Sequence, residues 1–152
     1  MKMKMMSMTR KNDGFTLVEL MVVAIIVAVL AAVAIPLMSA NKTRAMATEA
    51  EAGLGTVRSA LRALYAESGA YNADLNGDAI AVGAVAGAVP GIRTGDLDGR
   101  FFDDDDYTIV AIAAGTYTIR ATGNTGSAPQ GGQVAGVIIS MNQIGDLTRA
   151  GL

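Results

Sequence analysis

The feature that most constrains this sequence is a long apolar run that contains a single ionisable side chain. From Phe15 to Ala40 the only charged residue is Glu19. A helix needs roughly 20 mostly apolar residues to cross the hydrocarbon core of a bilayer, and this run has that length. Before it, four basic residues stand against Asp13, a side-chain charge of +3, which leaves −5 for the rest of the chain. A basic flank predicts that the N-terminus stays on the cytoplasmic side.

Glu19 is the exceptional residue of the run. A carboxylate on a membrane helix is costly and marks a functional site whose partner has to be found. One interpretation places it at the interface, where the side chain reaches water. The other requires cleavage after Gly14, because the new α-amino group of Phe15 would then lie four residues before Glu19. That ammonium group can neutralise the carboxylate within one chain or in a neighbouring copy.

The segment Gly14-Phe15-Thr16-Leu17-Val18-Glu19-Leu20 resembles the class III signal of type IV prepilins and type II secretion pseudopilins. The resemblance extends from Lys11 to Pro36. It implies cleavage after Gly14 by a prepilin peptidase, N-methylation of Phe15, and a role in subunit assembly for Glu19 and Thr16. Two other interpretations stay open, an ordinary secretory signal that ends near Ala31–Ala34 and an uncleaved anchor.

The order of the segments predicts four parts. They are a leader (1–14), a membrane or filament-core helix (15–40), an amphipathic continuation of that helix (41–69) and a globular head (70–152). Pro36 lies inside the predicted helix, where it cannot donate a backbone hydrogen bond. It predicts a kink, and the resemblance adds that the helix can unwind there on entering a filament.

The amphipathic part is read from apolar residues at spacings of three and four. The stripe consists of Met46, Ala50, Leu54, Val57, Leu61 and Leu64. Gly53 and Gly55 interrupt the helical propensity and allow a bend or close packing. Gly69 supplies a left-handed C-cap, so we expect the helix to end there.

The last third of the sequence predicts an antiparallel sheet. Strands are expected at Tyr107–Ile112, Thr116–Ala121 and Gly136–Met141, with the face of Tyr117, Ile119 and Ala121 alternating cleanly. We read residues 80–89 as a short strand or a packed loop, and residues 142–152 as a tail. Three strands need the helix for stability. The expected fold class is α+β, a long helix packed on a small antiparallel sheet, as in pilins.

Catalytic, cofactor and metal sites are not expected. The sequence has no His and no Cys, so it lacks the usual imidazole base, a thiol nucleophile and a disulfide. The run Asp103–Asp106 is read as a solvated turn, with a calcium site as the alternative. The acidic balance of the rest of the chain argues against a nucleic-acid surface.

The resemblance implies a structural subunit of a type IV pilus-like filament. Its expected partners are copies of itself, prepilin peptidase, the inner membrane and the pilus or secretion assembly machinery. The subunit would wait in the bacterial inner membrane and end in an extracellular pilus or a periplasmic pseudopilus. The alternatives are a type II secretion pseudopilin and a minor pilin that acts as a binding or adhesion module.

Overall fold

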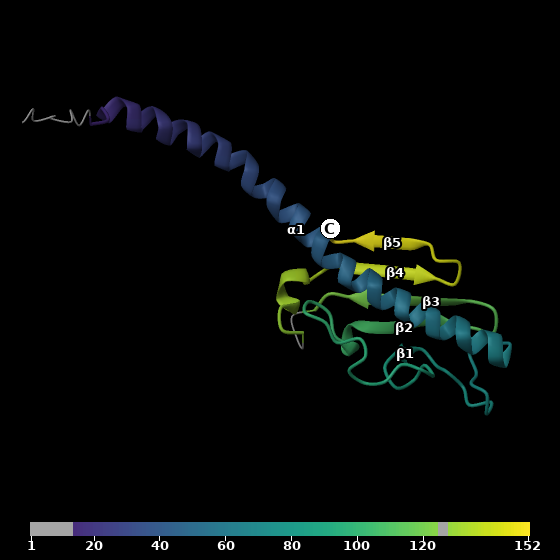
Figure 1. The fold of residues 1–152 in the computed structure, drawn as a ribbon. Coiled ribbons are helices and arrows are strands. Elements are labelled where there is room, and N and C mark those ends of the chain that lie inside the picture. Colours follow the sequence, from purple (N-terminus) through teal and green to yellow (C-terminus); the bar gives the residue numbers. More distant parts are fainter. Residues whose placement is uncertain (1–13, 125–127) are drawn as a thin grey trace, which may run out of the picture. The chain divides into compact units, whose positions relative to one another are not determined.

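The computed structural model describes residues 14–124 and 128–152, so the predicted leader lies almost entirely outside the described residues. Along the chain, the elements are α1 (Leu17–Ser68), β1 (Gly83–Ala84), η1 (Asp104–Asp106), β2 (Tyr107–Ile112), β3 (Tyr117–Thr122), η2 (Gly131–Val134), β4 (Ile138–Asn142) and β5 (Leu147–Ala150). This order is visible in Figure 1. The chain divides into two units, one up to Met38 and the other from Ser39 to Leu152. The predicted α+β class is confirmed.

The helix α1 has the predicted length and end. It stops at Ser68, and Gly69 follows with a positive φ of 79°, the left-handed cap that glycine adopts without strain. The amide of Gly69 donates to the carbonyl oxygen of Tyr65 at 2.9 Å. All six residues of the predicted stripe are buried, with exposed fractions of 6% or less. Periodicity in the sequence therefore identified the buried face correctly.

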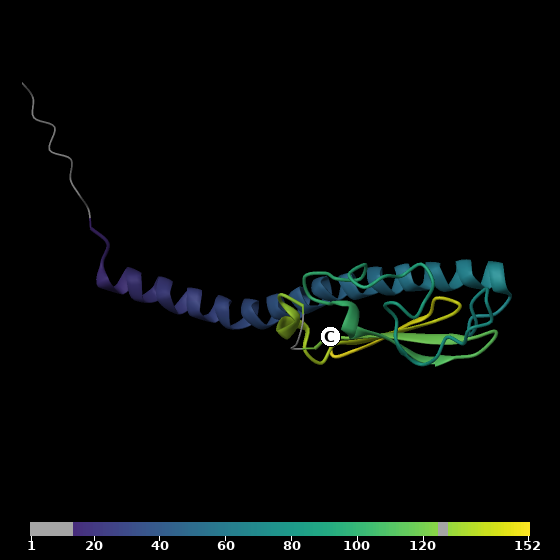
Figure 2. The same cartoon turned by 90° about the horizontal axis from the view of Figure 1, so that it is seen from below.

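The head is a two-layer structure, with the amphipathic part of α1 lying across one face of the sheet (Figure 2). The strand order is β1-β2-β3-β4-β5, and every neighbouring pair is antiparallel. On β3 the predicted face of Tyr117, Ile119 and Ala121 is buried. Side chains alternate between faces along a strand, so this face packs in the core while Thr118 and Arg120 remain half-buried.

The structure differs from the prediction at β5 and decides between two alternatives at β1. Residues 142–152 form no free tail, because β5 pairs with β4 along Ile138↔Ala150 to Met141↔Leu147. The turn between them is closed by Asn142, whose Oδ1 accepts the amides of Gly145 and Asp146. The strand β5 is short and largely exposed, so it lacks the apolar alternation that marks a strand in a sequence. The two-residue β1 settles the open reading of residues 80–89 as a minimal strand within a loop.

Polar contacts fasten α1 to the rest of the head. Oε1 of Glu49 accepts the amides of Phe101 and Phe102 at 2.7 and 2.8 Å. Glu51 and Arg149 form an ion pair at 2.6 Å, which joins α1 to β5. The loop before η1 and the last strand are therefore both anchored on the helix.

Candidate functional site

The candidate site predicted from the sequence lies at the start of α1, where Thr16 precedes the first helical residue. The hydroxyl of Thr16 donates to Oε2 of Glu19 at 2.7 Å, and the Thr16 amide donates to the same oxygen at 2.9 Å. In return, the Glu19 amide donates to the Thr16 hydroxyl at 3.2 Å. This reciprocal pattern is a capping box, which satisfies backbone donors that a helix start otherwise leaves unpaired.

The capping box gives Glu19 a local partner that our sequence analysis missed. Thr16 and Glu19 were named together as assembly residues, but without this contact between them. The spacing of Thr16 and Glu19 is the capping-box signature, so the signal was present in the sequence. The carboxylate also lies in the first turn, where the helix dipole favours a negative charge. Glu19 is thus held next to the predicted new N-terminus.

Gly14 and Phe15 lie just outside the helix. Both are exposed, and the Phe15 side chain is 82% accessible to solvent. A Cβ atom built on Gly14 would meet nothing within 4 Å. Within the described residues, the fold therefore supplies no steric reason for glycine at this position.

The first part of α1 presents apolar side chains on all sides. Every large apolar side chain from Leu17 to Met38 is at least 50% exposed. Among the described residues, α1 is the helix that is long and apolar enough to cross a membrane. Pro36 lies within this stretch, and the helix continues through it to Ser68. A helix that is apolar all round requires lipid or other apolar helices around it.

The acidic run in the head differs from the solvated turn that we predicted. Asp103, Asp104 and Asp106 are buried, with exposed fractions of 8, 8 and 4%. Asp103 caps the short helix η1, since its side chain accepts the Asp105 amide and Asp106 accepts the Asp103 amide, both at 3.2 Å. Asp104 accepts the amides of Gly95 and Leu97. Backbone donors thus replace water at both oxygens of Asp104 and at one oxygen each of Asp103 and Asp106, and the predicted solvation of these three side chains is wrong.

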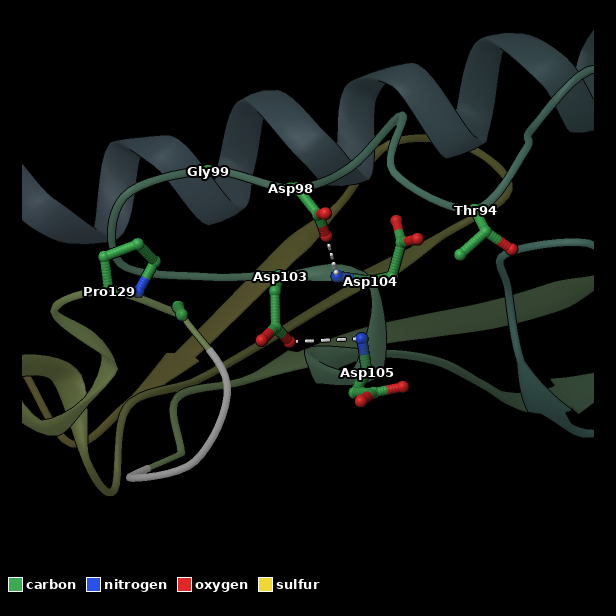
Figure 3. Close-up of a pocket in the computed structure, with 8 residues that line it drawn as sticks. Thr94, Asp98, Gly99, Asp103, Asp104, Asp105 and Pro129 are labelled. Atoms are coloured by element: carbon green, nitrogen blue, oxygen red, sulfur yellow. Dashed lines mark hydrogen bonds between the residues drawn. The ribbon is translucent and has the colours of Figure 1, made fainter.

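Asp103 and Asp104 line an open hollow of about 490 Å³ (Figure 3). The other residues that line it are Thr94, Asp98, Gly99, Asp105, Ala128 and Pro129. The dashed lines in Figure 3 mark two hydrogen bonds. The Asp104 amide donates to the carboxylate of Asp98, and the Asp105 amide donates to the carboxylate of Asp103. Within residues 14–124 and 128–152, no group of three or more His, Cys, Asp or Glu side chains is placed to hold a metal ion. Burial raises the pKa of Asp106, so at this position the protein favours the neutral acid.

Comparison with known proteins adds information at the start of the chain. A family model described as "Prokaryotic N-terminal methylation motif" matches residues 9–35. The chain is similar to "Fimbrial protein EcpB" of Eikenella corrodens, with 34% identity over 70 residues, 46% of this chain and 44% of that protein. It is also similar to "Type IV major pilin protein PilA" of Myxococcus xanthus (strain DK1622), with 37% identity over 62 residues, 41% of this chain and 28% of that protein.

The matched segments thus span less than half the length of either relative. No solved structure matches the chain. The resemblance seen in the sequence is confirmed: the chain carries the N-terminal methylation motif and has relatives named as pilin and fimbrial proteins.

Proposed function

We propose that this chain is a structural subunit of a type IV pilus-like filament. The observation that carries the proposal is a helix with apolar side chains on all sides and one carboxylate, Glu19, at its very start. Such a helix is unsuited to water, so it must be held in lipid before assembly and among copies of itself afterwards. The names of the two relatives, a fimbrial protein and a type IV major pilin, support a pilin-like structural subunit.

Processing would occur between Gly14 and Phe15. In this scheme residues 1–14 are removed, residues 15–40 form the membrane anchor and then the filament core, and residues 41–69 and 70–152 form the head. The exposure of Gly14 and Phe15 supports access for a peptidase. N-methylation of Phe15 would follow, on the amine that cleavage releases. The inner membrane, prepilin peptidase, the assembly machinery and further copies of the chain are the proposed partners.

Glu19 would do two things at once in the assembled filament. Its carboxylate closes the capping box with Thr16, and the same group would neutralise an α-ammonium group of Phe15, on its own chain or on the next. In a medium of low dielectric constant an unpaired carboxylate is strongly disfavoured, so the pairing would select the correct axial register of an incoming subunit. Pro36 would serve as the place where the helix departs from regular geometry.

The capping box makes it possible to separate these two roles by mutation. Glu19→Gln keeps a side-chain oxygen for the capping box, since glutamine is accepted at this position, but removes the charge. Thr16→Ala removes the N-cap, worth about 1 kcal/mol, but keeps the charge. We expect Glu19→Gln to insert and be cleaved but to yield no filaments, and Thr16→Ala to yield filaments in reduced amount. Shearing of surface filaments and immunoblotting of membranes measure both.

Mass spectrometry of the mature chain provides the independent check on processing. We expect Phe15 with one added methyl group in wild type and in both variants. Normal filament yield from Glu19→Gln would overturn charge pairing and leave capping as the role of Glu19. An N-terminus that still carries residues 1–14 would overturn the processing scheme as a whole.

A further inference from the structure

A second hollow lies at the end of the head where the amphipathic part of α1 begins. It has a volume of about 400 Å³ and contains two cations, Lys42 from α1 and Arg100 from the loop before η1. Met46 and Phe101 contribute apolar surface beside them. In both views the loop that carries η2 lies beside this part of α1 (Figures 1 and 2).

The two cations are available to an external anion. Among the described residues neither Lys42 nor Arg100 has an ion-pair partner. Glu49, one helical turn beyond Ala45, is occupied by the amides of Phe101 and Phe102. The positive charge of the hollow is therefore not neutralised within the head.

The geometry of the loop holds Arg100 in place. Its carbonyl oxygen accepts the Gln130 amide at 2.9 Å, and its guanidinium carbon lies 5.5 Å from the centre of the Phe101 ring. Gln130 and Gln133 also line the hollow, and the Gln133 amide nitrogen donates to the Gln130 amide oxygen at 2.8 Å. The hollow thus combines two positive charges with hydrogen-bonding groups and apolar side chains. This combination suits a lipid, whose charged headgroup is attached to hydrocarbon chains.

The position of Lys42 in the sequence sets its depth relative to a bilayer. Lys42 follows the uncharged stretch that ends at Ala40 by two residues, a rise of about 3 Å along a helix. The headgroup layer on each side of the hydrocarbon core is about 5–8 Å thick. A helix that spans the membrane with residues 15–40 therefore brings Lys42 to the level of the lipid phosphates.

We propose that this hollow binds the phosphate of an anionic phospholipid while the subunit waits in the membrane, an inference that rests on the proposed membrane-held state. Lys42 and Arg100 pair with the phosphate from two sides, and Met46 and Phe101 lie against the lipid's glycerol and upper acyl chain. The other conceivable occupant is an acidic side chain of a second copy. The lipid is favoured because Lys42, which lines the hollow, lies within two residues of the end of the uncharged stretch.

The test uses the full chain in detergent, titrated with short-chain phosphatidylglycerol and read by native mass spectrometry. Each cation near a membrane surface contributes about a fivefold gain in affinity for anionic lipid, so the pair contributes about 30-fold. We expect the double variant Lys42→Gln/Arg100→Gln to bind phosphatidylglycerol about 30-fold more weakly. The matched control, Arg62→Gln/Arg93→Gln, removes the same charge at two exposed positions elsewhere and should bind as wild type does.

Two further titrations test whether the hollow binds an anionic lipid or free phosphate. Phosphatidylcholine should bind weakly to all variants, and inorganic phosphate should not compete at concentrations where phosphatidylglycerol saturates. The charge-conserving double variant Lys42→Arg/Arg100→Lys should bind phosphatidylglycerol as wild type does. That result would show that lost charge, rather than lost folding, weakens binding in Lys42→Gln/Arg100→Gln. Equal weakening in the control pair, competition by inorganic phosphate, or a double variant that loses filaments but keeps its lipid would overturn the proposal. Lipid binding is measured on unassembled chains, so it stands or fails separately from the filament assay for Glu19.

Discussion

Gly53 and Gly55 lie two residues apart on α1, yet only Gly53 is sterically constrained. A Cβ atom on Gly53 would overlap the ring and hydroxyl of Tyr107, which is 1% exposed and surrounded by core. At Gly55 a Cβ atom would meet nothing within 4 Å. The sequence showed two helix-weakening glycines and left open whether each allowed a bend or close packing. Only the position of β2 across the helix shows that close packing explains Gly53.

This contrast gives a matched pair of substitutions. Gly53→Ala should destabilise the head by about 1–3 kcal/mol, because overpacking outweighs the gain in helix propensity. Gly55→Ala should stabilise it by up to about 1 kcal/mol, because nothing opposes that gain. Urea unfolding followed by circular dichroism measures both. Equal effects of the two substitutions would contradict the packing role of Gly53.

The residues of the candidate site illustrate both sides of what a sequence can reveal. Thr16 and Glu19 are close in the chain, so their contact follows from helix geometry and could have been predicted. The burial of Asp104 could not, because the amides that satisfy it belong to Gly95 and Leu97 in a loop without regular structure. Charge runs are read as solvated on average, and only the folded loop shows which donors replace the water.

At the scale of elements, the helix and the strands with alternating apolar residues were predicted within one or two residues. The missed strand β5, and β1, which was predicted only as one of two alternatives, are short edge strands with few buried side chains. Such strands form because a neighbour offers unpaired backbone groups, as β4 does for β5, and not because of their own composition. Their formation therefore depends on the neighbouring strands of the sheet, and the local sequence does not predict it.

The short helix η1 predicts how the stability of the head depends on pH. Burial raises the pKa of Asp106, so the folded state holds this proton more tightly than the unfolded state does. The stabilising effect of that proton is full below the ordinary carboxyl pKa of about 4 and is lost as the pH rises through the raised value. Ionisation of Asp106 as the pH rises therefore favours unfolding.

Asp106→Asn should remove this dependence, because asparagine keeps an oxygen for the Asp103 amide without a charge. We expect the melting temperature of the variant to exceed that of wild type at pH 7, and the difference to vanish as the pH falls below the ordinary carboxyl pKa of about 4. Asp105→Asn, at an exposed position of the same run, is the control and should change little. A constant difference between variant and wild type at all pH values would contradict the assignment to Asp106.

At the scale of the whole molecule, the hydrophobic core lies entirely in one of the two units. Its buried residues run from Met46 to Met141, and none comes from the apolar stretch up to Met38. The division into a membrane or filament-core helix (15–40), its amphipathic continuation (41–69) and a head (70–152) remains a prediction from the sequence.

The distribution of the core predicts that the head is independent of its anchor. A fragment from Ser39 to Leu152 should be soluble and monomeric, and should unfold cooperatively within a few degrees of the melting temperature of the head in the full chain. Size-exclusion chromatography and thermal circular dichroism test this. A fragment that aggregates or lacks a cooperative transition would show that the anchor contributes to the fold.

The neighbour-to-neighbour order of the strands has a consequence for biogenesis. Each strand pairs with the one synthesised just before it, and the helix on which they pack precedes them all. A chain synthesised from its N-terminus can therefore complete its head strand by strand, without waiting for a distant partner. A nascent chain arrested before Leu147 would lack β5 but could already hold the other strands. The ion pair between Glu51 and Arg149 would then be the last of the contacts between α1 and the sheet to form.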